Sequence, residues 1–464
     1  MIPVIAIVGR PNTGKSTLFN RLTGSRDALV ADRPGVTRDR NYGIASFHDK
    51  RIILVDTGGL NDIEAEKQSI ENLVSKQSHV AIQEADWIFW IVDGRYGLTT
   101  ADELIVKQLR PLASKLFLLV NKTEGMDPEL ACAEFHAIGI GTPHAISAQK
   151  GNGLDTVIDM TLSKFPTIEE AMAIDKKTLR ITIAGRPNVG KSTLINKILG
   201  EDRLLTFDEP GTTRDSIVIP FERQGKHYDL VDTAGVRRRS RLADPLEHYS
   251  VIKTIKAIES TDIVIIVIDS SEALTDQDLH LLGLTQNSGK PVIITANKWD
   301  NLRSSQKEKI RNQLDRKLGF IDYAQVHYIS ALHGSGVGAL FKSIDSIGSV
   351  IKKQFKSSTL TNILSEAIHN HPPPLNRGRR IKLRYAHLGG HDPFRIVVHG
   401  NQTKHITATY TRYLAKFFRN QLKLIGTPIF IEFKYGKNPY YKKRNVLTYR
   451  QLKKRRRTIK RFNR

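Results

Sequence analysis

Cysteine and long apolar runs are both scarce in this sequence. Cys132 is the only cysteine among the 464 residues. A lone cysteine cannot form an intramolecular disulfide, and no Cys-x-x-Cys pair is present, so a disulfide-stapled fold and a zinc ribbon are excluded. The longest apolar runs, such as residues 263–268, are far shorter than the roughly 18 to 20 residues that cross a bilayer. Because the first residues also lack a basic segment, we expect a soluble protein that is not exported.

Acidic residues are nearly absent from the last part of the chain. Lys and Arg number 18 against 22 Asp and Glu over residues 1–170, 27 against 22 over residues 171–355, and 26 against 3 over residues 356–464. The length suffices for roughly three domains of about 100 to 200 residues each. The sequence therefore predicts two near-neutral domains and one strongly basic domain, whose positive field suits a polyanion, most often nucleic acid.

The final residues, 441–464, carry 12 Lys or Arg and no acid. This composition predicts an extended segment that becomes ordered only on meeting an anion. RNA binding is the favoured interpretation, because closely spaced cations can follow a phosphate backbone. A disordered solubility tail and a basic localisation signal are the alternatives.

Internal repetition accounts for the two near-neutral domains. GRPNTGKST at residues 9–17 recurs as GRPNVGKST at residues 185–193, an offset of 176 residues. The same offset relates PGVTRD to PGTTRD, LVDTGG to LVDTAG, and NKTE to NKWD. The sequence thus predicts a duplicated domain and not a short-period solenoid. The predicted segments are a first domain at 1–164, a linker at 165–178, a second domain at 179–350, a basic domain at 351–440 and a tail at 441–464.

Each glycine-rich motif lies between a predicted strand, at residues 4–8 or 181–184, and a predicted helix. In that context GxxxxGK[ST] wraps phosphates, because the glycines let main-chain N–H groups converge and the helix adds its positive end. We expect Lys15 and Lys191 to reach the β- and γ-phosphates and the serine after each lysine to ligate magnesium. The alternative, a glycine-rich turn, is disfavoured by two copies in register.

Two further motifs predict contacts to the metal and the γ-phosphate. Asp56 and Asp232 end strands, and we expect them to hold magnesium through water. Thr37 and Thr213 lie in loops between strand signals, where a hydroxyl can reach magnesium and a main-chain N–H can reach the γ-phosphate. These loops are therefore predicted to become ordered when a triphosphate binds.

The Asn-Lys-x-Asp motif predicts the choice of base. The Asp300 carboxylate can accept hydrogen bonds from guanine N1–H and N2–H₂, whereas adenine presents an acceptor at N1. The first repeat carries Glu124, whose carboxylate is one methylene further out. Guanine preference is the favoured interpretation there, with weakened affinity and lost selectivity as alternatives. The main chain of Ala148 and Ala331, in two Ser-Ala loops, is expected to complete the base pockets.

These motifs together predict one nucleotide site in each repeat. The first site comprises Gly9, Arg10, Pro11, Asn12, Thr13, Gly14, Lys15, Ser16, Thr17, Asp56, Thr57, Gly58, Gly59, Leu60, Asn121, Lys122, Thr123, Glu124, Ser147 and Ala148. The second comprises Gly185, Arg186, Pro187, Asn188, Val189, Gly190, Lys191, Ser192, Thr193, Asp232, Thr233, Ala234, Gly235, Val236, Asn297, Lys298, Trp299, Asp300, Ser330 and Ala331. The residues assigned to hydrolysis are Lys15, Thr37, Gly59, Lys191, Thr213 and Gly235. The predicted magnesium ligands are Ser16, Thr37, Asp56, Ser192, Thr213 and Asp232.

The basic domain shows a different order of elements. Its patterning predicts a helix at 351–370, strands at 381–386 and 394–398, a helix at 407–424 and a strand at 429–433. The fold class predicted for the whole chain is α/β, with two tandem P-loop domains on doubly wound, mostly parallel sheets, followed by an α+β domain.

The motifs closely resemble one family over most of the chain, the Der (EngA) family of bacterial ribosome-assembly GTPases in the TrmE/Era/EngA class. The motifs that carry the resemblance are GRPNxGKST and PG[VT]TRD, each twice, DTGGL, DTAGV, NKTE, NKWD, NHPPPxxRGRR, LRYA, RYL, GTPI and GKNPY. The resemblance implies GTP or GDP at two sites with Mg²⁺, and a KH-like domain of a kind associated with RNA. It further implies a cytoplasmic bacterial factor that assembles the large ribosomal subunit and binds its rRNA according to the bound nucleotide. We expect a monomer with no membrane partner.

The sequence differs in two places from the patterns of related proteins, and each difference changes an expected activity. Leu60 and Val236 stand where Ras-like enzymes place a water-orienting glutamine, so intrinsic hydrolysis is predicted to be slow. The resemblance implies that Asn12 and Asn188 help to bind K⁺, which would supply the missing positive charge. The basic domain also lacks a GxxG clamp, so the usual KH grip on four nucleotides is not expected.

Two other classes of function agree less well with the sequence. A GTP-dependent tRNA-modification enzyme of a related family would have a single GTPase domain inserted in helices and a C-terminal cysteine, and this sequence has neither. A passive RNA-binding protein with degenerate nucleotide sites is disfavoured because both Lys-Ser pairs and both DTxG aspartates are intact.

Overall fold

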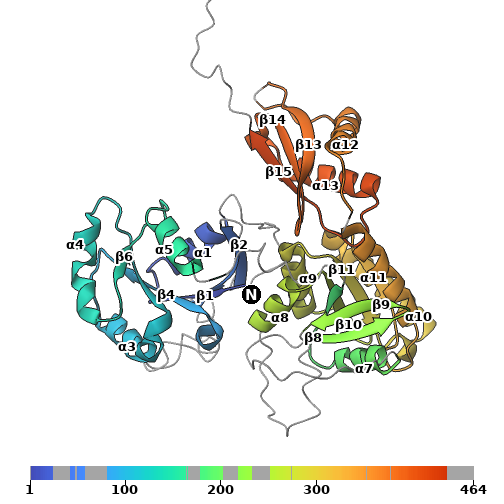
Figure 1. Cartoon of the computed structure of the whole chain (residues 1–464), viewed down its shortest axis with the longest axis horizontal. Coiled ribbons are helices and arrows are strands. Elements are labelled where there is room, and N and C mark those ends of the chain that lie inside the picture. The colour runs from blue at the N-terminus through green and yellow to red at the C-terminus, as the bar shows by residue number, and fades with distance from the viewer. Residues whose placement is uncertain are drawn as a thin grey trace, which may run out of the picture. The chain divides into compact units, whose positions relative to one another are not determined.

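The computed structural model describes residues 2–24, 42–47, 50–57, 81–163, 165, 178–201, 218–231, 251–272, 274–351, 353–376 and 378–435. They form two compact units (Figure 1). One unit holds the described residues of 1–353 together with 391–394 and 423–429, and the other holds those of 354–390, 395–422 and 430–464. No helix in the described part of the chain is long and apolar enough to span a bilayer.

The first repeat folds around a six-stranded sheet in the order β2-β3-β1-β4-β5-β6, in which only β2 and β3 are antiparallel. All seven residues of its strand β4 are buried, as expected for a parallel strand with helices on both faces. Its elements are β1 Val4–Val8, α1 Lys15–Thr23, β2 Tyr42–Phe47, β3 Lys50–Asp56, β4 Trp87–Asp93, α3 Thr100–Leu109, η3 Arg110–Lys115, β5 Leu116–Asn121, α4 Pro128–Ala133, η4 Glu134–Ile138, β6 Pro143–Ala145 and α5 Leu154–Leu162.

The second repeat has the same topology, with the strand order β12-β11-β10-β7-β9-β8 and one antiparallel pair, β8 and β9. Its elements are β7 Leu179–Ala184, α7 Lys191–Glu201, β8 Val218–Arg223, β9 Lys226–Val231, α8 Val251–Glu259, β10 Ile263–Asp269, α9 Asp276–Ser288, β11 Val292–Asn297, η6 Trp299–Asn301, α10 Ser304–Lys317, η7 Gly319–Ile321, β12 Gln325–Tyr328 and α11 Val337–Ile351. The predicted doubly wound, mostly parallel sheets are therefore confirmed. In such sheets ligands bind beyond the carboxyl ends of the strands, which is where the sequence motifs lie.

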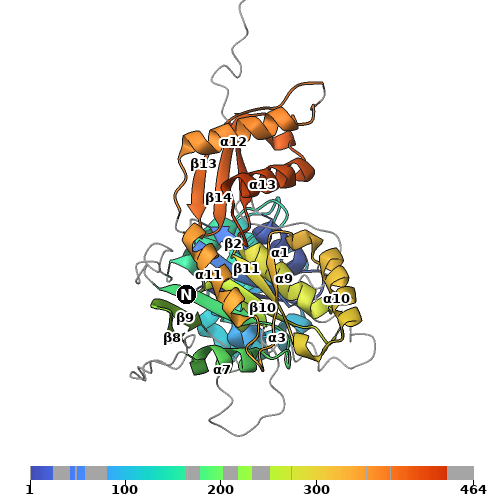
Figure 2. The same cartoon turned by 90° about the vertical axis from the view of Figure 1, so that its right-hand side faces the viewer.

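The basic domain contains a three-stranded sheet in the order β13-β14-β15. Its elements are α12 Ser357–Asn370, β13 Lys382–His391, β14 Phe394–Asn401, η8 Thr403–His405, α13 Ala408–Leu422 and β15 Phe430–Tyr435. Both helices lie on the same side of the sheet (Figures 1 and 2). The predicted order of helix, strand, strand, helix and strand is confirmed.

The two largest differences between predicted and observed elements concern the first helix and the first strand of the basic domain. The predicted helix at 351–370 is the end of α11 followed by α12, because Lys356 takes an extended conformation with ψ 140°. Strand β13 runs to His391, five residues beyond the predicted end at 386. Its last part, LGGH, has no alternation of apolar and polar residues, so the patterning could not extend the strand.

Candidate nucleotide-binding sites

The glycine-rich loops join the first strand of each sheet to the following helix, β1 to α1 and β7 to α7. Gly14 has φ 103° and Gly190 has φ 97°, in the left-handed region that favours glycine. A Cβ at either position would also collide with the side-chain amide of Asn121 or Asn297. Both loops therefore require glycine for its torsion angle and for the close approach of an asparagine.

The lysine of each loop lies across the loop itself. Lys15 Nζ donates to the main-chain oxygen of Arg10 at 2.8 Å, and Lys191 Nζ donates to that of Arg186 at 2.6 Å. Lys15 is buried and opens helix α1, so its ammonium adds to the positive end of that helix. Together with the main-chain N–H groups, this arrangement suits a bound phosphate.

A serine and an aspartate meet beside the first loop. Asp56 is the last residue of β3, which pairs with β1, and Ser16 Oγ donates to Asp56 Oδ2 at 2.9 Å. A hydroxyl oxygen and a carboxylate are the hard ligands that Mg²⁺ prefers. Two of the predicted magnesium ligands are thus adjacent in space. The predicted site residues that lie outside the described part of the chain are Thr37, Gly58, Gly59, Leu60, Thr213, Asp232, Thr233, Ala234, Gly235 and Val236.

An asparagine connects the phosphate loop to the Ser-Ala loop in each repeat. Asn121 Nδ2 donates to the main-chain oxygen of Thr13 at 2.8 Å, and its Oδ1 accepts from the main-chain N–H of Ala148 at 2.8 Å. Asn297 makes the same two hydrogen bonds in the second repeat, each of 2.8 Å. Its partners there are Val189 and Ala331. We call this contact the asparagine bridge, and it brings together motifs that are more than a hundred residues apart.

The lysine of each Asn-Lys motif strengthens the same region. Lys122 Nζ donates to the main-chain oxygen of Asn12 at 2.7 Å and lies 2.7 Å from Asp93 Oδ2. Lys298 forms an ion pair with Asp269. Burial acts to raise the pKa of Asp269, but the hydrogen bonds from Lys298 and from a neighbouring serine outweigh it and hold that pKa below its usual value. Both lysines thus pair with a carboxylate at the end of the adjacent strand, β4 or β10.

Glu124 occupies the predicted base-reading position of the first repeat. It accepts a hydrogen bond from Ser147 Oγ, and Arg95 Nη2 lies 3.3 Å from its Oε2. The Ser147 bond is the main reason why the pKa of Glu124 lies below its usual value, with a smaller contribution from Arg95. The group is therefore a carboxylate at neutral pH, as acceptance from guanine N1–H and N2–H₂ requires.

Asp300 occupies the corresponding position of the second repeat with different neighbours. The bond from Ser330 is the main cause that lowers its pKa, and His333 Nε2 lies 3.5 Å from its Oδ2. The counterpart of Arg95, by the 176-residue offset, is Ser271, which donates to Asp269 instead. The two base positions thus share an anchoring serine but differ in the cation beside the carboxylate.

Comparisons with known proteins agree with this geometry. A family model described as 50S ribosome-binding GTPase matches residues 4–122 and 180–298, and one described as KH-domain-like of EngA bacterial GTPase enzymes, C-terminal, matches residues 354–434. GTPase Der of Legionella pneumophila (strain Corby) is 52% identical, with 99% of each chain covered, and GTPase Der of Teredinibacter turnerae is 50% identical, again with 99% of each chain covered. The chain belongs to the GTPase Der family.

Membership of the Der family confirms the resemblance drawn from the motifs and makes the chain a GTP-binding, GTP-hydrolysing protein. It also confirms that the C-terminal domain is KH-like. Among solved structures, Era in complex with MgGDPNP and a segment of 16S ribosomal RNA is similar to this chain with a TM-score of 0.30 and 20% identity, over 57% of this chain and 95% of that one.

Two buried aspartates that sequence reasoning did not select hold the phosphate loops of this Der-family chain. Arg10 Nε donates to Asp102 Oδ1 at 2.8 Å, and Arg186 Nε donates to Asp278 Oδ1 at 2.9 Å. Both aspartates are fully buried and also complete the capping boxes that begin α3 and α9. Because the arginines belong to the GRPN motifs, these contacts fix each loop to a neighbouring helix.

The duplication of the domain carries a sequence signal for these residues. Asp102 and Asp278 are 176 residues apart, as are Asp93 and Asp269, so they follow the same offset as the motifs. A single aspartate in an amphipathic stretch indicates no particular chemistry, whereas an aspartate kept in both repeats points to a shared role. Comparison of the repeats position by position would have found both pairs.

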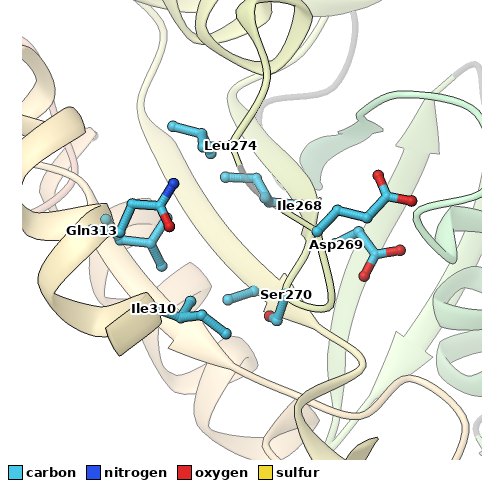
Figure 3. Close-up of a pocket in the computed structure, with 9 residues that line it drawn as sticks. Ile268, Asp269, Ser270, Leu274, Ile310 and Gln313 are labelled. Atoms are coloured by element: carbon cyan, nitrogen blue, oxygen red, sulfur yellow. The ribbon is translucent and has the colours of Figure 1, made fainter. Parts of the chain in front are cut away.

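The pocket shown in Figure 3 is distinct from the phosphate loop of the second repeat. It lies beside Asp269 and Ser270 at the end of β10, with Leu274 and, from α10, Ile310 among its apolar lining residues. The enclosed space holds about one water molecule. A nucleotide needs a far larger site, so we assign the Der-family nucleotide sites from the loops and the asparagine bridges.

Proposed function

We propose that this Der-family chain is a GTP-driven assembly factor for the large ribosomal subunit, which binds rRNA in a nucleotide-dependent way. The observation that carries the proposal is the asparagine bridge, which is present in both repeats with the same bond lengths. This shared geometry supports the binding of a base and its phosphates in both domains. The partner is supported by the matching family description, 50S ribosome-binding GTPase, and by 26 Lys and Arg against 3 acids over residues 356–464.

The molecular setting belongs to the same proposal. We take the chain to be a monomer of the bacterial cytoplasm, with domain bounds at 1–164, 179–350 and 351–440, a linker at 165–178 and a basic tail at 441–464. The tail adds 12 cations to the RNA-binding domain and would strengthen its hold on phosphates at low salt.

Two guanine nucleotides would occupy the sites predicted from the motifs, with Lys15 and Lys191 at the phosphates and Glu124 and Asp300 at the bases. Mg²⁺ fits beside the first loop, because Ser16 Oγ and Asp56 Oδ2 already lie 2.9 Å apart. When bound, the ion would neutralise charge on the β- and γ-phosphates. In the second repeat Ser192, Thr213 and Asp232 are the corresponding proposed ligands.

The loops that hold Thr37 and Thr213 would link nucleotide state to RNA binding. A γ-phosphate offers these loops contacts that GDP cannot, so GTP would favour one arrangement and hydrolysis would release it. The nucleotide would thus decide when the RNA-binding surface is available. Slow hydrolysis suits this role, because the bound state must last until an assembly step is complete.

Potassium is expected to speed hydrolysis by at least about tenfold over sodium at equal ionic strength, because a bound cation would supply the positive charge that an arginine finger gives elsewhere. Asn12 and Asn188, exposed on the phosphate loops with φ 66° and 64°, are the proposed K⁺ ligands. Steady-state turnover in KCl and NaCl measures the effect. Asn12→Ala together with Asn188→Ala should remove the difference, whereas Asn401→Ala, at an exposed position on β14, should preserve it. Equal rates in both salts would contradict potassium activation.

Sedimentation with ribosomal subunits tests the proposed partner. At physiological salt we expect the wild-type chain to sediment with the large subunit in the presence of a non-hydrolysable GTP analogue, and much less with GDP. The small subunit and GDP serve as controls. Binding that ignores the nucleotide and is lost as salt rises would mean that the basic residues alone make the contact, and the nucleotide-dependent part of the proposal would fail.

A further inference from the structure

Three aromatic rings project from one face of the KH-like sheet. They belong to Tyr385 and His387 on β13 and to His399 on β14. These residues alternate along their strands with buried Ala386 and Val398, and the main chain of Ala386 exchanges hydrogen bonds with the side chain of a threonine on α12. Since both helices lie on one side of the sheet (Figures 1 and 2), the rings occupy the other face. Tyr385 is 45% exposed there.

The three rings, which we call the ring face, are nearly parallel. The Tyr385 and His399 ring centroids are 4.3 Å apart with an interplanar angle of 6°. His387 lies 5.1 Å from His399 at 29° and 5.9 Å from Tyr385 at 24°. A further flat ring can therefore join the group in the same orientation, which is how nucleobases bind to aromatic side chains.

Two buried ring nitrogens belong to the ring face. His387 Nδ1 and His399 Nε2 are buried without a hydrogen-bond partner among the described residues. Buried polar groups in proteins are normally paired, so two unpaired ring nitrogens on one face of a sheet are unusual for a purely structural cluster. The pKa of His399 lies below its usual value mainly because the ring is partly buried. The nearby His387 and Lys434 lower it further. Its ring is therefore uncharged at neutral pH and can stack without repelling the cations around it.

Charged side chains flank the rings on the same face. Lys434 pairs in register with His399, and Glu432 and Arg395 follow at alternate positions, so all three share the face with the rings. Glu432 lies 3.5 Å from Arg395 and 3.8 Å from Lys434, and the Lys434 side chain is 55% exposed. Arg395 and Lys434 share the single acid Glu432, so the surface beside the ring face carries a net positive charge within a strongly basic domain.

We propose that the ring face is a binding site for unpaired bases of single-stranded RNA, with Lys434 at the phosphate backbone. Flat bases match the parallel rings, and phosphates match the excess positive charge. Duplex RNA fits poorly because its bases are already stacked within the helix. This inference rests on the proposed function, since it names the part of the RNA that the KH-like domain binds.

The test compares the full-length wild-type chain with Tyr385→Leu, which removes the ring, and with Tyr385→Phe, which keeps it. Fluorescence anisotropy measures binding to an unstructured single-stranded RNA and to a duplex of the same length. We expect Tyr385→Leu to bind the single strand about tenfold more weakly than wild type, the effect of losing one stacked base. Its affinity for the duplex should equal that of wild type. Tyr385→Phe should match wild type on both RNAs. GTP turnover and thermal unfolding check that the variants remain folded.

Salt dependence separates stacking from charge. The slope of log affinity against log salt should be unchanged in Tyr385→Leu, whereas Lys434→Gln should lower its magnitude by about 0.7, the value for one phosphate of a single strand. A single-stranded RNA with several abasic sites gives a measurement that needs no variant, and it should bind the wild-type chain about tenfold more weakly than the intact strand.

The outcomes distinguish the ring face from the proposed function. If the wild-type chain binds single-stranded RNA while Tyr385→Leu and the abasic strand show no loss, the ring face is not the base site, although RNA binding stands. If the wild-type chain binds neither RNA nor ribosomal subunits, the proposed function fails and this inference fails with it.

Discussion

Replacing Lys191 with alanine is expected to lower kcat/KM for GTP at the second GTPase domain by at least about 100-fold. The ammonium lies across the phosphate loop, 2.6 Å from the main-chain oxygen of Arg186, where negative charge of a bound phosphate would be greatest. Lys15→Ala should have the same effect at the first domain, because Lys15 makes the corresponding contact. Nucleotide affinity and single-turnover hydrolysis of each variant measure the loss.

The duplicated domain supplies the control for this experiment. Each single variant keeps one intact lysine, so its residual turnover reports the other domain, and the variant with both substitutions should hydrolyse no GTP above background. Lys309→Ala, at an exposed position on α10, should behave as wild type. Turnover at the wild-type level in the variant with both substitutions would show that these loops do not carry the activity.

Asp300→Asn is expected to weaken GTP binding at the second domain by at least about 100-fold. A site that hydrogen-bonds its substrate binds poorly when one of the donors or acceptors no longer matches. The Asp300 carboxylate is proposed to accept hydrogen bonds from N1–H and N2–H₂ of guanine. The amide of Asn would instead turn its NH₂ group, a donor, toward one of these two donors. Xanthine has an oxygen acceptor in place of the 2-amino group. Xanthosine triphosphate should therefore bind the variant better than GTP does, and a titration with both nucleotides measures the exchange.

The corresponding change in the first domain is Glu124→Gln, and it tests whether a longer carboxylate reads guanine in the same way. If it does, Glu124→Gln should also exchange GTP for xanthosine triphosphate. Ser330→Ala is a milder comparison for the second domain, because it removes the bond that lowers the pKa of Asp300 but leaves the carboxylate in place. An Asp300→Asn variant that keeps GTP affinity and gains none for xanthosine triphosphate would refute the assigned base contact.

Sequence reasoning reaches the parts of the candidate site in which the residue type itself indicates the chemistry. Gly14, Lys15 and Asp300 belong to motifs whose spacing indicates phosphate or base binding without any knowledge of the fold. The doubly wound sheets are also predictable from the sequence, because their buried strands are unbroken apolar runs. In Ile263–Asp269, for example, every residue except the final aspartate is apolar. Both depend on local pattern only.

The parts that were missed depend on contacts between distant segments. Asp102 acts through Arg10, 92 residues away, and neither residue type nor local spacing indicates that pairing. The ring face depends on the register between β13 and β14, which brings His399 against Tyr385. In the sequence the histidines of this domain had no metal spacing and no acidic partners, and no pattern joined them to a tyrosine.

The asparagine bridge has a consequence for the energetics of nucleotide binding. Asn121 and Asn297 bond the phosphate loop on one side and the Ser-Ala loop on the other, so folding already sets the distance between the two halves of each site. The conformational entropy of the two halves is therefore lost when the domain folds and not when the ligand binds. A complete nucleotide would bind both halves at once, whereas guanosine or pyrophosphate alone would bind only one. Each domain is therefore expected to discriminate by ligand length as well as by base identity.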